Sequence, residues 1–276
     1  MIDDLKIIEK LCKDMRLDII ELAYRCDGPA HIGGALSIVE CLAILYGMVM
    51  KHNPKDPLQK DRDRFILSKG HGVLAFYSVL HQTGYFSRET LLTFKNEGSA
   101  LIAHPVMNMN LGIESSNGSL GHGLSMSVGI GWGLKKRGSK SKIFTLLGDG
   151  ECDEGSVWEA AMSASRLEID NLTAIVDCNG FQSDGPIRND SNCLIMESKW
   201  KAQGWDTRIV DGHSLEALFT AVTQPNQIKT ARRPRVIIAS TIKGCGVSFM
   251  QGDNSWHHNR LTQITYDKAR AELRNE

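Results

Sequence analysis

Short, largely apolar runs alternate with helix-forming segments along this chain, and this alternation limits the fold more than any other feature of the sequence. The clearest unit lies between 142 and 177, where KIFTLLG is followed by the helix-forming SVWEAAMSASRL and then by LTAIVD. Runs that are apolar at successive positions are typical of parallel strands buried on both faces. We therefore predict an α/β fold, a doubly wound parallel sheet with helices on both faces.

The spacing of apolar residues also predicts the other helices and strands. Apolar residues at helical spacing indicate an amphipathic helix over 3–24. Further helices are predicted at 38–50, 73–83, 125–136, 155–167, 214–222 and 266–276, and strands at 64–68, 142–148, 172–177, 206–210 and 235–240. Residues 98–123 are rich in Gly, Ser and Asn and predict a long, functional loop. Because we find no repeat or linker, residues 1–276 are expected to form one domain.

Charge and cysteine content exclude several classes of protein. Lys plus Arg equals Asp plus Glu, at 32 each, so no global field attracts nucleic acid or a membrane, and the basic cluster at 229–235 is interpreted as a solvated loop. The seven cysteines are odd in number and include no CxxC pair, which argues against a disulfide framework or a zinc site and favours a reducing compartment. The N-terminus lacks a signal-peptide core, and the apolar run at 41–50 is too short to span a bilayer. We expect a soluble, cytoplasmic protein.

Two oxygen-bearing side chains follow neighbouring strands of the βαβ unit. Asp149 lies between two glycines at the end of 142–148, and Asn179 follows 172–177, thirty positions later. A right-handed crossover returns to the same edge of the sheet, so the two side chains are expected to meet there. Carboxylate and amide oxygens suit Mg²⁺ or Ca²⁺, and the glycines let a phosphate approach the backbone. We prefer a metal–diphosphate site to the alternative of two unrelated turns.

A GDG followed about thirty residues later by Asn resembles the thiamine diphosphate fingerprint, and further motifs resemble the transketolase family in particular. In the family's order they are GPAHIGGALSIVECLAILY (28–46), HNPKDP (52–57), DRDRFILSKGHG (61–72), GSLGHGLSMSVG (118–129), GDGECDEGSVWEA and DCNGFQSDG. Each motif is short, and their number and order make the resemblance specific. It extends from about residue 25 to 258 and implies the family's diphosphate-binding domain.

Complete transketolases add a pyrimidine-binding and a C-terminal domain. The resemblance therefore implies the N-terminal subunit of a split transketolase, whose C-terminal partner carries the pyrimidine-binding domain in an α2β2 assembly. The implied reaction is the transfer of a two-carbon glycolaldehyde unit from a ketose phosphate to an aldose phosphate, with thiamine diphosphate and a metal as cofactors. We find no candidate for the acid that activates the cofactor, as expected if it lies on the partner. Two departures from the family are His122 for Gln and Ile32 for Pro, and the second bears on how His31 is aimed.

The resemblance also implies roles for individual residues. The metal ligands would be Asp149, Asn179 and the backbone carbonyl of Phe181. The cofactor would contact His71, Gly118, Leu120, Gly150, Asn179, Lys243 and His257. Catalytic roles on the substrate side would fall to His31, His104 and His257, and Glu154 would lie at the subunit boundary. Histidine titrates near neutrality and suits proton transfer, although a single loop histidine is more often simply exposed. His52, His81 and His213 are expected to be structural, and His122 and His258 receive no role.

Three alternative functions remain to be weighed. The α subunit of a thiamine-dependent 2-oxo acid dehydrogenase shares the metal motif, but the HNP, DRDRF and KGHG segments count against it. A nucleotide-binding dehydrogenase is disfavoured because no strand is followed by GxGxxG. A non-catalytic relative is disfavoured because Asp149, Asn179, His71 and His257 are retained. The sequence leaves the donor sugar open: pentose phosphates are the default, and sugar acids or sulfonated sugars are alternatives.

Overall fold

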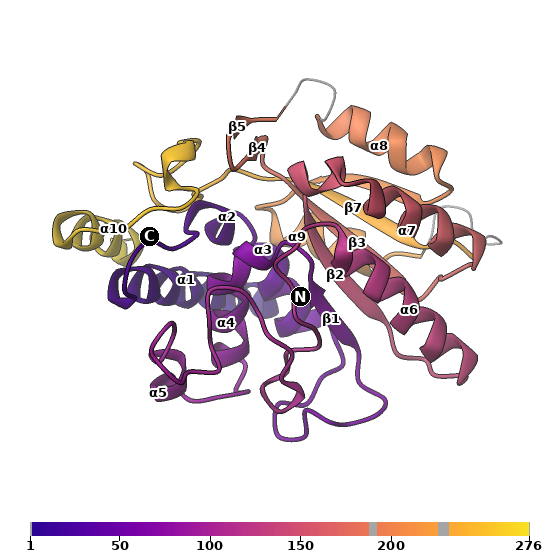
Figure 1. Cartoon of the computed structure of the whole chain (residues 1–276), viewed down its shortest axis with the longest axis horizontal. Coiled ribbons are helices and arrows are strands. Elements are labelled where there is room, and N and C mark those ends of the chain that lie inside the picture. The colour runs from indigo at the N-terminus through magenta and orange to yellow at the C-terminus, as the bar shows by residue number, and fades with distance from the viewer. Residues whose placement is uncertain (1, 188–191, 226–231, 276) are drawn as a thin grey trace.

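A five-stranded parallel sheet forms the centre of the computed structural model, which describes residues 2–187, 192–225 and 232–275 (Figure 1). The strands pair in the order β1-β2-β3-β7-β6, so that β7 lies between β3 and β6. Their bounds are β1 Arg64–Leu67, β2 Ile143–Gly148, β3 Leu172–Cys178, β6 Asp206–Asp211 and β7 Arg235–Ser240. A small antiparallel pair, β4 Phe181–Gln182 and β5 Gly185–Pro186, follows β3.

Helices cover both faces of the sheet. Their bounds are α1 Ile2–Arg25, α2 Gly33–Leu36, α3 Val39–Ile44, α4 Val73–Gln82, α5 Arg88–Leu91, α6 His122–Lys136, α7 Gly155–Arg166, α8 Cys193–Ala202, α9 Leu215–Thr223 and α10 Gln263–Asn275. Helices α6, α7 and α8 lie together on one side of the sheet, and α1, α3, α4 and α9 lie on the other (Figure 1). The predicted doubly wound parallel sheet is confirmed.

Successive side chains of each strand enter opposite cores, which explains why the strand sequences are apolar throughout. In β2, Phe144 and Leu146 enter the core shared with α1, α3 and α4, whereas Ile143 and Leu147 enter the core shared with α6, α7 and α8. All four side chains are at most 1% exposed. Because successive side chains of a strand point to opposite faces, a sheet packed on both sides requires apolar residues at every position.

Several predicted boundaries shift, and some elements escape prediction. The segment 38–50 is α3 followed by a π-helical turn, and the loop 98–123 ends where α6 begins at His122. Glycines lower helix propensity in α6, but packing against α7 overrides this. Helix α8 was not predicted because it is poorly amphipathic; its N-terminus is capped by the Asn192 side chain, which accepts from the Ile195 amide at 3.0 Å. Residues 229–231 of the basic cluster, and residue 276 of the last helix, lie outside the described residues.

The carboxyl ends of four adjacent strands bring polar residues to one edge of the sheet. Lys69 follows β1, Asp149 follows β2, Asn179 follows β3 and Lys243 follows β7. The register pairs Gly148 with Asp177 and Cys178 with Ser240, so these strands end at nearly the same level. Within the described residues, no helix is both long and apolar enough to cross a bilayer.

Candidate functional site

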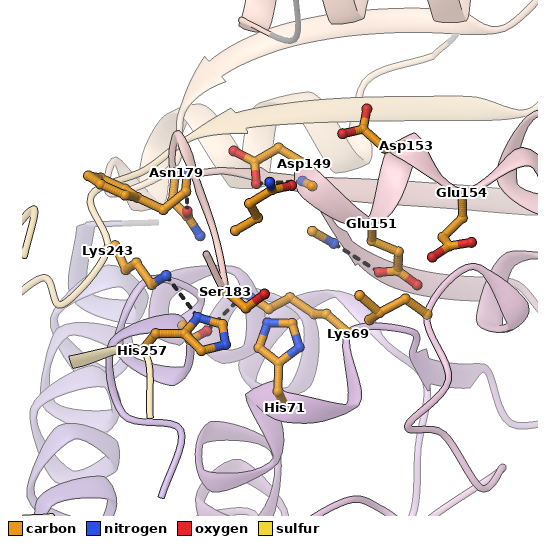
Figure 2. A pocket seen from close by; sticks show the side chains of 16 residues that line it. Lys69, His71, Asp149, Glu151, Asp153, Glu154, Asn179, Ser183, Lys243 and His257 are labelled. Atoms are coloured by element: carbon orange, nitrogen blue, oxygen red, sulfur yellow. Dashed lines mark hydrogen bonds between the residues drawn. The ribbon is translucent and has the colours of Figure 1, made fainter. Parts of the chain in front are cut away.

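A cavity of about 270 Å³ opens at this edge of the sheet (Figure 2). All four strand ends contribute to it, together with two histidines that lie in or next to short 3-10 turns. Six of the side chains that line it are Lys69, His71, Asp149, Asn179, Lys243 and His257. The site therefore joins segments that lie as far apart in the sequence as residues 69 and 257.

Asp149 presents a buried carboxylate to the cavity. It is 1% exposed, and its two oxygens accept hydrogen bonds from the amides of Gly150 at 2.8 Å and Gly180 at 2.7 Å. Burial, and then the charge of neighbouring Asp177, raise the pKa of Asp149 to about 6. A Cβ at Gly150 would lie 2.9 Å from the Cβ of Gln182, so the turn requires glycine at this position. Asp149 therefore offers a carboxylate that a cation would stabilise.

Asn179 is held in one orientation by two partners. Its amide nitrogen donates to Asp177 at 2.7 Å, and its amide oxygen accepts from the Phe181 amide at 3.1 Å. A carboxylate can only accept and a backbone N–H can only donate, so these partners settle which end of the side chain is oxygen. The oxygen lies on the side of Phe181, which also lines the cavity. A carboxylate, an oriented amide oxygen and a nearby backbone are a donor set that fits a hard divalent cation.

Asp177 is a fully buried carboxylate, and the hydrogen bonds that it accepts form a network next to the cavity. It accepts from Ser37 and Asn179, each at 2.7 Å, and from Thr241, and it forms an ion pair with Lys69. Burial opposes ionisation, but the Lys69 charge and these donors lower the pKa of Asp177 below its ordinary value. Lys69 also donates to the Gly34 carbonyl at 3.0 Å. The network ties the ends of β1, β3 and β7 to α2 and to Ser37, its C-cap residue.

Glu151 fastens the glycine-rich loop to the strand ends. Its carboxylate accepts from the amides of Gly121 at 2.9 Å and Gly148 at 3.0 Å, and from the Ser68 hydroxyl. Burial raises the pKa of Glu151, although these hydrogen bonds oppose the shift. Gly121 has a φ of 83°, and a Cβ there would lie 2.8 Å from the Cβ of Glu154. Close approach of the loop to the start of α7 thus depends on glycine.

Lys243 and His257 form a second polar pair on the far wall of the cavity. The Lys243 ammonium donates to Asn254 at 2.6 Å and lies 2.9 Å from His257 Nδ1, which accepts from it. The imidazole proton then resides on Nε2, which can donate a hydrogen bond. Burial, and then the charge of Lys69, lower the pKa of Lys243 to about 8. Burial, and then Lys243, lower the pKa of His257 to about 4, so the ring is neutral at pH 7.

His257 also belongs to a group of five histidines that come from four separate segments of the chain. The ring of His31 lies 5.7 Å from His71, 5.6 Å from His104, 5.3 Å from His257 and 4.4 Å from His258. Burial, and then neighbouring positive charge, lower the pKa of His31 to about 3. Burial also lowers the pKa of His71 and His104. Neutral rings can both donate and accept hydrogen bonds, which suits recognition of hydroxyl groups and proton transfer.

Most of the predicted site residues lie around the cavity. Those that line it are His71, Leu120, Asp149, Gly150, Glu154, Asn179, Phe181, Lys243 and His257. The other three lie next to it in series: His31 contacts His71 and His257, His104 contacts His31, and a Cβ at Gly118 would lie 3.6 Å from the His104 ring. Glu154 is exposed, and His122 is exposed at the start of α6.

Lys69, Asp177 and Glu151 were missed as site residues. All three are at most 2% exposed, and Lys69 and Asp177 stand at strand ends, where the rule that singled out Lys243 would also have found them. Among the described residues, no group of three or more His, Cys, Asp or Glu side chains is arranged to hold a metal ion. The predicted ligand set contains one such side chain, so it relies on the Asn179 amide and a backbone carbonyl.

Comparisons with known proteins agree on one family. The profile of the family described as "Transketolase, thiamine diphosphate binding domain" matches residues 8–275. The 6-deoxy-6-sulfo-D-fructose transketolase subunit SqwG of a Clostridium species is 41% identical over 90% of this chain and 90% of its own length. An apulose-4-phosphate transketolase subunit of Actinobacillus succinogenes is 38% identical over 98% of this chain and 96% of its own.

A solved structure extends the comparison to three dimensions. The transketolase of Campylobacter jejuni superposes with a TM-score of 0.85 at 29% identity and covers 99% of this chain. This chain spans 43% of the length of that enzyme. The parallel sheet, the polar residues at its carboxyl edge and the match over residues 8–275 lead to one assignment. The chain belongs to the transketolase family and corresponds to its thiamine diphosphate-binding domain.

Proposed function

We propose that this chain is the N-terminal subunit of a two-subunit transketolase, a transferase that depends on thiamine diphosphate and on Mg²⁺ or Ca²⁺. It would transfer a two-carbon glycolaldehyde unit from a ketose phosphate to an aldose phosphate, with pentose phosphates as the default substrates. Residues 1–276 would form one diphosphate-binding domain of a cytoplasmic α2β2 assembly. The observation that carries the proposal is the convergence of Asp149, Asn179 and Phe181 with Lys243 and His257 around one cavity.

The residues present fit a metal-bound diphosphate. Asp149 and the oriented amide oxygen of Asn179 would hold the cation with the Phe181 carbonyl, and phosphate oxygens and water would complete its shell. Lys243 and the Nε2 proton of neutral His257 would donate to the diphosphate, as would His71, because all three line the cavity. When bound, thiamine diphosphate supplies the nucleophilic carbon and the electron sink that the transfer requires.

The remaining residues would act on the sugar. His31 contacts His71 and His257, and His104 contacts His31. Burial lowers the pKa of both His31 and His104. They would donate to and accept from the sugar hydroxyls and move protons to and from the reacting oxygens. Glu154 lines the cavity but is exposed, which suits a residue at the boundary with a partner chain.

The need for a partner is supported by the relatives. Two similar proteins of nearly this length are named transketolase subunits, and the solved enzyme that matches this chain is more than twice as long. We propose that a C-terminal subunit with the pyrimidine-binding domain completes the site and supplies the acid that activates the cofactor. Those relatives are named for a sulfonated sugar and for apulose 4-phosphate, so assays of the donor should include both kinds of sugar beside pentose phosphates.

Two measurements on the purified chain test the proposal. Calorimetric titration with thiamine diphosphate should show binding in Mg²⁺ or Ca²⁺ and none in excess EDTA. An assay with xylulose 5-phosphate and ribose 5-phosphate should show no turnover by the chain alone and turnover when a pyrimidine-binding subunit is added. Turnover by the chain alone would refute the need for a partner. Oxidation of pyruvate with an electron acceptor, in place of sugar transfer, would favour the 2-oxo acid dehydrogenase instead.

A further inference from the structure

Two cysteine sulfurs lie almost in bonding contact beside the proposed metal site. Cys178 is the last residue of β3 and Cys193 is the first residue of α8, and their Sγ atoms are 2.7 Å apart. The bond in a disulfide is about 2.05 Å long. Both residues are free thiols; Cys178 is 7% exposed, and Cys193 is partly exposed. The pair therefore combines a thiol that a small oxidant can reach with a buried thiol at disulfide range.

We propose that Cys178 and Cys193 form a reversible disulfide that acts as a redox switch on cofactor binding. With hydrogen peroxide as the oxidant, the Cys193 sulfur attacks one peroxide oxygen, forming a sulfenic acid and releasing water. The Cys178 sulfur then attacks the Cys193 sulfur, which forms the S–S bond and releases the hydroxyl as a second water molecule. Overall, two thiols lose two electrons and two protons, and one peroxide is reduced to two waters. An exogenous dithiol reverses the step by thiol–disulfide exchange.

The position of Cys178 explains why this bond would affect the cofactor, and this consequence rests on the proposed function. Cys178 separates Asp177 from Asn179, and those two side chains are hydrogen-bonded at 2.7 Å. Its own carbonyl accepts from the Thr241 amide at 3.2 Å. Closing the gap to bonding distance, about 2.05 Å, moves the end of β3 and the start of α8 closer together. Mg²⁺ requires near-ideal geometry, with ligand distances held to about 0.2 Å, so the displaced Asn179 would bind it less well.

Peptide mapping tests the bond without reference to the cofactor. Trypsin cleaves after Arg166, Arg188 and Lys199, so Cys178 falls in the peptide 167–188 and Cys193 in the peptide 189–199, each with no other cysteine. After treatment of the full chain with a modest excess of hydrogen peroxide, a non-reduced digest should contain these two peptides linked. Oxidation should weaken thiamine diphosphate binding in Mg²⁺ about tenfold, as perturbed support of a metal ligand typically does, and dithiothreitol should restore it.

Two variants control the experiment. Cys193→Ser should abolish both the linked peptide and the effect of peroxide on binding. Cys245→Ser removes another partly exposed thiol, one that contacts Arg16, and should change neither result. Absence of the linked peptide, or a linked peptide with unchanged cofactor affinity, would overturn the switch. A reduced chain that does not bind thiamine diphosphate would overturn the proposed function and the effect on binding with it, while the peptide map would still report on the thiol pair.

Discussion

Two buried aspartates at the ends of neighbouring strands have opposite electrostatic surroundings. Asp177 pairs in register with Gly148, the residue before Asp149, and both carboxylates are at most 1% exposed. Asp177 accepts from four side chains, one of them the Lys69 ammonium, and its pKa is lowered. Asp149 accepts from two backbone amides, and within the described residues no ion pair involves it; its pKa is raised to about 6.

The difference separates a structural carboxylate from one that is open to a ligand. A buried charge is tolerated when a partner compensates it, and otherwise it shifts its pKa or binds a cation. The charge of Asp177 is compensated within the chain by Lys69, whereas the charge of Asp149 has hydrogen bonds but no such partner in the part of the chain that the structure describes. Two aspartates that look alike in the sequence should therefore respond differently to substitution.

The largest effect should come from Asp177→Ala. This change leaves the Lys69 ammonium buried at 1% exposure without its counterion. Removing one partner of a buried ion pair typically costs about 3–5 kcal/mol, and we expect a loss of that size in the free energy of unfolding. Urea denaturation of the purified chain at pH 7 measures it. A loss below about 1 kcal/mol would show that Lys69 does not depend on Asp177.

The double variant Lys69→Met with Asp177→Leu should recover most of that loss. Apolar replacement of both members of a buried pair is often neutral or stabilising. Ser37 and Thr241 would lose an acceptor, so we expect recovery of about 2–3 kcal/mol rather than all of it. Comparing the double variant with both single variants in urea isolates the coupling between the two side chains. If the losses in the free energy of unfolding of Lys69→Met and Asp177→Leu simply add in the double variant, the assigned ion pair is contradicted.

Asp149→Ala should leave the fold nearly intact and remove cofactor binding. The substitution leaves two backbone amides without their hydrogen-bond acceptor but also removes an uncompensated buried charge. The free energy of unfolding should therefore change by about 1 kcal/mol or less. Binding of thiamine diphosphate in Mg²⁺ should weaken at least about 100-fold, because losing a ligand costs no less than losing its support. Calorimetry and urea denaturation of one preparation give both numbers. Unchanged affinity would leave the metal assignment without support.

The strands and the convergence of their ends were predictable because they depend on local pattern. A strand buried on both faces must be apolar throughout, and the five predicted strands agree with the observed ones to within one residue at each end. The glycines and polar residues that follow them stood out against those runs. Asp149 and Asn179 were found in this way, since one crossover connects their strands.

The ion pair between Lys69 and Asp177 was not predictable from the sequence because it depends on the order of the strands in the sheet. Lys69 follows β1 and Asp177 lies in β3, and β2 separates the two strands in the sheet. No pattern in FILSKG or LTAIVD indicates which strands are neighbours or that the lysine reaches across β2. The Cys178–Cys193 contact was not predicted for a related reason, because α8, which carries Cys193, was not recognised as a helix.

The smallest effect tests whether Lys243 is a concealed counterion of Asp149. Lys243 lines the same cavity, but its ammonium bonds to Asn254 and His257. If Lys243 serves to contact the diphosphate, Lys243→Met should weaken thiamine diphosphate binding about tenfold through loss of one charge-assisted contact. It should also raise the pKa of His257, which burial and then Lys243 hold at about 4. Calorimetry measures the first effect, and NMR titration of the histidine ring protons measures the second.

The dependence of stability on pH distinguishes a Lys243 that contacts the diphosphate from a Lys243 that is the counterion of Asp149. The folded pKa of His257 lies below its ordinary value of 6.5, so the unfolded chain binds more protons between pH 4 and 6.5. The contribution of His257 to stability is therefore complete above pH 6.5 and is lost as the pH falls toward 4. With Lys243→Met the loss between about pH 6.5 and 5 should be smaller than in the unmodified chain, and stability at pH 7 should be nearly unchanged. If Lys243 were instead a counterion of Asp149, as Lys69 is of Asp177, its removal should destabilise the chain at pH 7, as is expected of Lys69→Met.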